Sequence, residues 1–207
     1  MLKRIINGLL AGIMIAIGGS VFLSLYAESR IVGAIFFAVA LLTICFGKFS
    51  LFTGAIGYIP RNHKKDDFSA LLLGLLGNAA GTIICGLLMK IASPSICNTA
   101  TVICSAKLLQ NIPMTLIRAF FCGILMYVAV SMFREHKTTL GIFFCIPVFI
   151  LSGFEHSIAN MFYFAASDIV SLEAFGYICL CILGNAIGGM LFPLLTMLGE
   201  IGNADKK

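Results

Sequence analysis

The sequence predicts an all-α membrane protein with six transmembrane helices in two inverted three-helix repeats, in which helices 2 and 5 are broken. Three observations support this fold class. First, 60% of the residues are hydrophobic and only 11% are charged, and the mean hydropathy of +1.05 is typical of membrane proteins. Second, six apolar runs follow one another along the chain. Third, two polar motifs of the first half recur in the second.

Each apolar run is long enough to cross a bilayer, which takes about 20 residues. The runs cover residues 5–25, 31–59, 68–91, 113–133, 140–166 and 172–198. The first run continues without a cleavage site of small residues, so we expect a retained helix and not a removable signal peptide. Little of the chain lies between the runs. We therefore expect one transmembrane domain over residues 1–207, with repeat 1 at about 1–92 and repeat 2 at about 108–207.

The basic residues predict the orientation, because Lys and Arg are retained on the cytoplasmic side of a membrane. One side of the expected topology is rich in them and the other is poor. The rich side holds Lys3, Arg4, Arg61, Lys64, Lys65, Arg134, Lys137, Lys206 and Lys207, and the poor side holds Arg30, Lys90 and Lys107. We therefore expect a bacterial-type inner membrane with both termini cytoplasmic. This topology explains the net charge of +5 without a nucleic-acid partner.

A five-residue motif indicates that the chain consists of two similar halves. "GNAAG" at 77–81 recurs as "GNAIG" at 184–188, which is 107 residues later. Each half contains three spans, so the second half crosses the membrane in the opposite direction and the repeats are inverted. The glycines spaced four residues apart in each motif favour close packing between helices.

A second pair of segments at the same offset lies within two long apolar runs. "FGKFSLFTG" at 46–54 aligns with "GFEHSIANM" at 153–161, which pairs Ser50 with Ser157. Both runs exceed a single crossing, and polar residues and glycines interrupt them. Non-helical backbone at membrane depth survives only where protein buries it or water reaches it. The two breaks therefore predict a cavity near the midplane, where the N-termini of half-helices favour an anion.

Four segments resemble the formate/nitrite transporter family. "SGFEHSIANMF" at 152–162 resembles the family's fifth-helix signature, and "LFTG" at 51–54 resembles its second-helix break. "RAFFCG" at 118–123 and "GNAIGG" at 184–189 are similar to its fourth-helix and sixth-helix patterns. The resemblance implies an aquaporin-like protomer, assembled in the lipid bilayer as a homopentamer with one pore per protomer. It also implies small monovalent anions of weak acids as substrates, namely formate, nitrite or hydrosulfide.

The resemblance implies roles for individual residues. His156 is similar to the family's pore histidine, Thr53 to the threonine of the second-helix break, and Lys107 to the lysine of the outer vestibule. Asn160 belongs to the histidine motif and is expected in the polar part of the pore. The residues expected at the apolar constrictions are Phe37, Leu41, Leu51, Phe52 and Phe149.

Two positions depart from the family pattern. Gly123 stands where the family usually has Asn, and "KFSLFT" at 48–53 replaces a G-A-E/D-L-F-T pattern. An acidic residue is thereby lost, and Lys48 is gained beside the break. Because the offset of 107 places Lys48 opposite Glu155, we expect these two residues to set the local field. They do so either as a buried ion pair or with Lys48 facing the pore.

These residues predict a pathway in which Lys107 attracts the anion and His156 acts at the centre. A bare charge is costly in an apolar constriction, whereas a lysine at the mouth raises the local anion concentration. Histidine exchanges a proton near neutral pH. We therefore expect the anion to cross in a largely neutral form, with His156 as proton or hydrogen-bond partner and Thr53 beside it. The proton comes either from His156 or from water.

Structural interpretations compete with these roles. His156 or Asn160 could bond the broken backbone, Glu155 could cap the second half-helix, and the five apolar residues could be ordinary packing. A neutral-solute channel on the same architecture is an alternative function, although the Asn-Pro-Ala pairs of aquaporins are missing. A haem-holding subunit of an enzyme is a third, and a single intramembrane histidine argues against it.

We expect no enzymatic activity, no cofactor and no metal site. The eight cysteines show no C-x-x-C spacing and no histidine cluster. Most of them lie within the apolar runs and are expected to pack as free thiols. Only Cys97 and Cys104 share an outer connection, where they either pair or stay reduced.

Overall fold

The computed structural model describes residues 1–204, and all regular elements in this range are helices. In chain order the elements are α1 (Leu2–Ser24), α2 (Arg30–Gly47), α3 (Phe52–Ala55), the 3₁₀ helix η1 (Ile56–Tyr58), α4 (Lys65–Ala92), α5 (Pro94–Leu108), α6 (Ile112–His136), α7 (Leu140–Leu151), α8 (Ser157–Ala166) and α9 (Leu172–Ala204). Lys206 and Lys207, which were expected on the cytoplasmic side, lie outside the described residues.

Five helices in this part of the chain are long and apolar enough to cross a membrane, namely α1, α2, α4, α6 and α9. Large apolar side chains such as Leu76, Ile84 and Leu88 are exposed on α4, as expected of a helix that faces lipid. The prediction of an all-α membrane protein is therefore confirmed. The predicted run 31–59 contains α2, α3 and η1, and the run 140–166 contains α7 and α8.

The segment expected as an outer connection after α4 is largely helical and forms α5. Pro94 lies in its first turn, where the missing N–H of proline costs no intrahelical bond. Cys97 and Cys104 are both buried on this helix, and both are free thiols. Seven residues of α-helix separate them by roughly 10 Å along the axis, which is too far for a disulfide.

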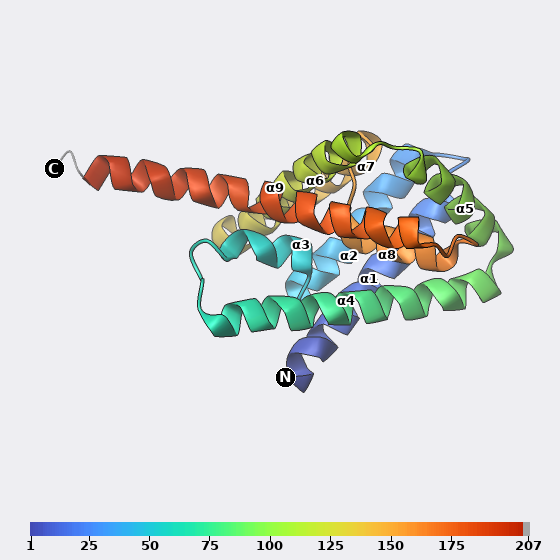
Figure 1. The fold of residues 1–207 in the computed structure, drawn as a ribbon, viewed down its shortest axis with the longest axis horizontal. Coiled ribbons are helices and arrows are strands. Elements are labelled where there is room, and N and C mark those ends of the chain that lie inside the picture. Colours follow the sequence, from blue (N-terminus) through green and yellow to red (C-terminus); the bar gives the residue numbers. More distant parts are fainter. Residues whose placement is uncertain (205–207) are drawn as a thin grey trace.

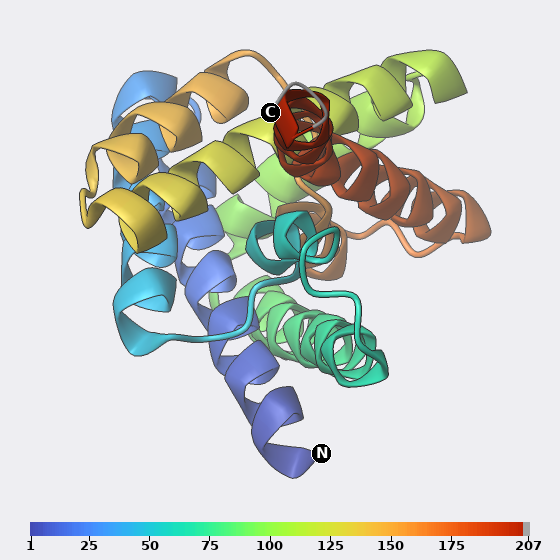
Figure 2. The ribbon, with the colours of Figure 1, turned by 90° about the vertical axis from the view of Figure 1, so that its left-hand side faces the viewer.

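The long helices pack as two close pairs, α1 against α4 and α6 against α9 (Figure 1). Both contacts require glycine. A Cβ added at Gly77 would lie 2.3 Å from the carbonyl oxygen of Ile5, and one added at Gly188 would lie 1.9 Å from that of Phe120. The close packing predicted from the paired glycines is thus confirmed. The short helices α3 and α8 lie inside the bundle, with α2 and α7 packed together at one side (Figure 2).

Asn78, from the first copy of the repeated motif, is fully buried and ties three segments together. Its Oδ1 accepts a hydrogen bond of 2.9 Å from the backbone N–H of Phe52, the first residue of α3. Its Nδ2 donates to the carbonyl oxygens of Gly8 at 2.8 Å and Ser50 at 2.7 Å. Asn78 therefore holds the start of α3 against α1 and α4.

Asn185, from the second copy of the motif, makes the same three bonds on the other side of the bundle. Its Oδ1 accepts a hydrogen bond of 2.8 Å from the backbone N–H of Ser157, the first residue of α8. Its Nδ2 donates to the carbonyl oxygens of Ala119 and Glu155, each at 2.8 Å. Each motif asparagine thus satisfies the backbone of a helix that starts inside the protein, where water cannot do so.

The hydrogen bonds correct the register predicted from the sequence. Asn78 binds a residue 26 positions earlier, whereas Asn185 binds one 28 positions earlier. The connection after the second break is therefore two residues longer than the one after the first. When the two residues that the asparagines bind, Phe52 and Ser157, are aligned with each other, Lys48 matches Gly153 and not Glu155. Both matched residues have a left-handed backbone, with φ of 53° at Lys48 and 67° at Gly153.

We expect Asn185→Ala to lower the free energy of unfolding by at least about 3 kcal/mol, because three buried backbone groups lose their partner at roughly 1–3 kcal/mol each. The measurement is the melting temperature of the purified protein in detergent. Asn98→Ala is the matched control, because Asn98 is exposed on α5. Equal melting temperatures of the two variants would contradict the structural role of Asn185.

Candidate functional site

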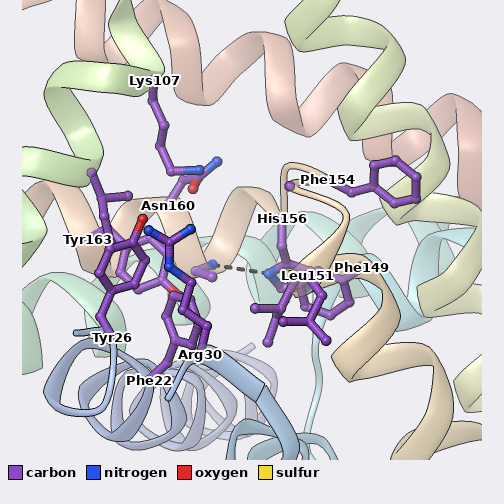
Figure 3. Close-up of a pocket in the computed structure, with 14 residues that line it drawn as sticks. Phe22, Tyr26, Arg30, Lys107, Phe149, Leu151, Phe154, His156, Asn160 and Tyr163 are labelled. Atoms are coloured by element: carbon purple, nitrogen blue, oxygen red, sulfur yellow. Dashed lines mark hydrogen bonds between the residues drawn. The ribbon is translucent and has the colours of Figure 1, made fainter. Parts of the chain in front are cut away.

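Two cavities lie at opposite ends of α2. The His156 cavity, of about 210 Å³, is lined by Arg30, Lys107, His156 and Asn160 among others (Figure 3). The Lys48 cavity, of about 390 Å³, is lined by Lys48, Arg134 and Lys137 together with residues such as Leu41 and Leu51. Arg30 begins α2 and Lys48 follows its last residue. The 18 residues of this helix place Arg30 and Lys48 roughly 27 Å apart along its axis.

His156 is buried and hydrogen-bonded through both ring nitrogens. Its Nδ1 accepts a bond of 3.1 Å from the backbone N–H of Ala159, so the side chain caps the start of α8. A nitrogen that accepts cannot carry a proton, so the proton of the neutral ring lies on Nε2. Nε2 then donates to Thr53 Oγ1 at 2.9 Å. The structure brings His156 and Thr53 together, and His156 takes the capping role for which Glu155 was a candidate.

Glu155 is 2% exposed and bound by three side chains. Lys107 forms an ion pair with its Oε2, Asn160 Nδ2 donates to the same oxygen at 3.0 Å, and Gln110 Nε2 donates to Oε1 at 2.9 Å. The expected pair between Glu155 and Lys48 is therefore wrong. Asn160 lines the His156 cavity, but its amide binds the Glu155 carboxylate and not the broken backbone.

Arg30 supplies the uncompensated charge of the His156 cavity. Lys107 points toward this cavity, but its charge is offset by Glu155. The guanidinium of Arg30 lies 4.1 Å from the centre of the Tyr26 ring (Figure 3), and Arg30 has no ion-pair partner in residues 1–204. A cation held on an aromatic face keeps its hydrogen-bond donors available to a ligand.

A buried apolar layer lies between the cavities. All five residues expected at the constrictions are buried, and Phe37 packs edge-to-face on Phe149 with ring centroids 6.3 Å apart. Phe149 also stacks on His156, with centroids 5.6 Å apart and the rings inclined by 20°. Leu41 and Leu51 face the Lys48 cavity and Phe149 faces the His156 cavity. Thr53 and His156 are the polar pair within this layer.

Lys48 lies away from Glu155, at the exposed end of α2, where it lines the other cavity. Gly123 lines neither cavity. A Cβ at Gly123 would lie 2.3 Å from the backbone oxygen of Asn185, so the larger residue usual in the family does not fit this helix contact unchanged. The described residues contain no group of three His, Cys, Asp or Glu that could hold a metal ion.

Sequence reasoning did not identify Arg30 or Gln110 as site residues. Arg30 could have been found, because it is one of few basic residues on the side that was expected to be outside. Gln110 lies beyond the end of α5 and reaches Glu155 across 45 residues of sequence. No local pattern indicates that contact.

The apolar helices define a helical membrane protein that has a cavity with basic lining residues on each side of a buried apolar layer. The chain belongs to the formate/nitrite transporter family, whose model matches residues 1–199. The resemblance inferred from the four sequence segments is thus confirmed.

Two of the relatives that the chain matches are nitrite transporters. The chain is 30% identical over 176 residues to the nitrite transporter NirC of Salmonella typhimurium, a match that covers 75% of this chain and 65% of the relative. It is 28% identical over 176 residues to NirC of Escherichia coli, covering 75% of this chain and 66% of that protein. The chain thus spans slightly less than two thirds of the length of these relatives.

Two solved structures have the same fold. An FNT family ion channel matches with a TM-score of 0.82 at 25% identity, over 92% of this chain and 87% of that one. A pentameric formate channel with formate bound matches with a TM-score of 0.81 at 21% identity, over 97% of each chain. The second likeness establishes the fold alone.

Proposed function

We propose that this protein passes small monovalent anions of weak acids, such as formate, nitrite or hydrosulfide, across the membrane. The observation that carries the proposal is the pair of basic cavities on either side of the buried layer containing His156 and Thr53. The protein acts as a homopentamer in a bacterial-type inner membrane, and it is not an enzyme.

The proposed protomer has six membrane crossings in two inverted repeats, at about residues 1–92 and 108–207. Here α2 with α3 forms one broken crossing and α7 with α8 forms the other. The matching bonds of Asn78 and Asn185 to the two breaks support this assignment. The basic residues support cytoplasmic termini, because Lys48, Arg134 and Lys137 gather at one end of α2 and Arg30 lies at the other.

In the proposed mechanism Arg30 attracts the anion into the His156 cavity, and the anion crosses the apolar layer as its neutral acid. An unprotonated anion there would lose its hydration without gaining a countercharge. His156 is a poor proton donor in this arrangement, since its single ring proton is shared with Thr53 and its other nitrogen caps α8. The proton therefore comes from the external solution, where hydronium protonates the anion and is left as water. His156 and Thr53 provide hydrogen bonds in the middle of the layer.

Uptake into proteoliposomes tests the proposed function. Formate, nitrite, hydrosulfide, lactate and glycerol are compared at equal gradients, with protein-free liposomes as the control. We expect faster uptake of the first three solutes than of glycerol, and faster uptake at lower external pH because more of each anion is protonated. Uptake of glycerol alone would replace this proposal with the neutral-solute channel.

We expect Arg30→Gln to raise the half-saturating anion concentration about threefold to tenfold, because a charge at the mouth increases the local anion concentration. The maximal rate should stay within about twofold, since Arg30 lies outside the apolar layer. Lys65→Gln is the control, because Lys65 is exposed and lines neither cavity. The difference between wild type and Arg30→Gln should shrink at high ionic strength. A lower maximal rate with unchanged half-saturation would contradict a capture role.

A further inference from the structure

The Lys48 cavity carries a cationic group that the capture of anions at Arg30 does not explain. Three basic residues line it, namely Lys48, Arg134 and Lys137. None of them has an ion-pair partner among residues 1–204, and none of the residues that line the cavity is acidic. This differs from the His156 cavity, where Glu155 offsets the charge of Lys107.

The three basic residues are not equivalent. Lys137 Nζ donates to the carbonyl oxygen of Arg134 at 2.6 Å, so it is engaged at the C-terminal end of α6. The guanidinium of Arg134 lies 4.5 Å from the centre of the Tyr58 ring, which holds it at the cavity while its N–H donors remain available. A guanidinium in this setting can bind the two oxygens of a carboxylate or nitrite side by side.

Lys48 occupies a position where glycine would be less strained. Its φ of 53° is left-handed, and the structurally matched residue in the other half of the chain is Gly153. Side chains other than glycine are disfavoured in this conformation. A lysine at such a position, lining a cavity that Arg134 also lines and unpaired among residues 1–204, indicates a use for its charge.

We propose that Lys48 and Arg134 form a second anion-receiving site, which takes the same small monovalent anion from the opposite side of the membrane. This inference rests on the proposed function. Arg134 supplies the paired donors and Lys48 the point charge, and Leu41 and Leu51 at the inner wall of the cavity begin the apolar layer. The pathway then has a capture site at each mouth, so transport is efficient in both directions.

The test uses right-side-out and inside-out membrane vesicles, which present opposite mouths to the external solution. Initial rates of radiolabelled formate uptake are measured over a range of concentrations. We expect Lys48→Met to raise the half-saturating concentration about threefold to tenfold in one vesicle type only, and Arg30→Gln to do so in the other. Lys65→Met should alter neither. Equal effects of Lys48→Met in both vesicle types, or none in either, would overturn the inference.

A binding measurement separates this inference from the proposed function. Saturation-transfer NMR detects formate bound to the purified protein in detergent, without any transport. In the Arg30→Gln protein, formate binding at the His156 cavity is weakened, so the remaining NMR signal reports mainly on the Lys48 cavity. Adding Lys48→Met and Arg134→Gln should remove most of this remaining signal. If wild type binds formate in this manner but transports no anion, the proposed function fails and the second site stands. If transport occurs and the added substitutions leave the signal unchanged, the second site fails.

Discussion

Lys107→Met is expected to lower the free energy of unfolding by about 3–5 kcal/mol, because it leaves a buried carboxylate without its countercharge. Glu155 is 2% exposed, and Lys107 is its only cationic partner in the described part of the chain. The substitution should also slow anion uptake at every concentration, since an uncompensated negative charge then lies beside the His156 cavity. Melting temperature in detergent and uptake into proteoliposomes measure the two effects.

The double variant Lys107→Met with Glu155→Gln should recover part of both losses. The second substitution removes the unpaired negative charge, and the amide that replaces the carboxylate stays within hydrogen-bonding reach of Gln110 and Asn160. Lys90→Met is the matched control. Lys90 is paired with Asp168 at 2.8 Å, but both side chains are partly exposed, and such pairs contribute only about 0–1 kcal/mol. If Lys107→Met impaired uptake only at low anion concentration and left stability unchanged, Lys107 would be a capture residue as first predicted.

His156→Asn is expected to reduce anion uptake by up to about tenfold while the protein stays folded. Asn is a favoured helix N-cap, so it can still accept the N–H of Ala159. Its shorter side chain does not reach Thr53, and the apolar layer loses the donor of a hydrogen bond worth roughly 0.5–1.5 kcal/mol to the neutral acid. Initial uptake rates and melting temperature are measured on the same preparation.

Two further variants separate the roles of His156. His156→Phe should lose both uptake and the cap, with an added destabilisation of about 1 kcal/mol. Asn111→Ala also removes a cap, the 2.9 Å bond to the N–H of Met114 at the start of α6, but it leaves the pathway intact and should transport normally. Wild-type uptake by His156→Asn would show that the histidine serves α8 alone.

The membrane fold was predictable because the signals for it are local. Each apolar run consists of consecutive residues, and the length of such a run indicates whether a helix can cross a bilayer. The repeated motif around Asn78 and Asn185 indicated two related halves. Short motifs placed Thr53 and His156 among the expected pore residues, and the structure places these two side chains 2.9 Å apart.

Contacts between distant segments were decided only by the tertiary structure. The sequence offset of 107 placed Lys48 opposite Glu155, but a two-residue difference in connection length shifts the true match to Gly153. Glu155 is instead bound by Lys107, which lies on α5, and by Gln110, which lies just after this helix.

The sequence by itself therefore determined the membrane environment, the apolar helices and the motif that contains His156, because hydropathy and short motifs act within one segment. The tertiary structure decided which charge offsets which. Lys107 is compensated, whereas Arg30 and Lys48, at opposite ends of α2, have no ion-pair partner within residues 1–204. The physical reason is that an ion pair depends on distance in space, and a charge at membrane depth pairs with whatever partner helix packing brings within reach.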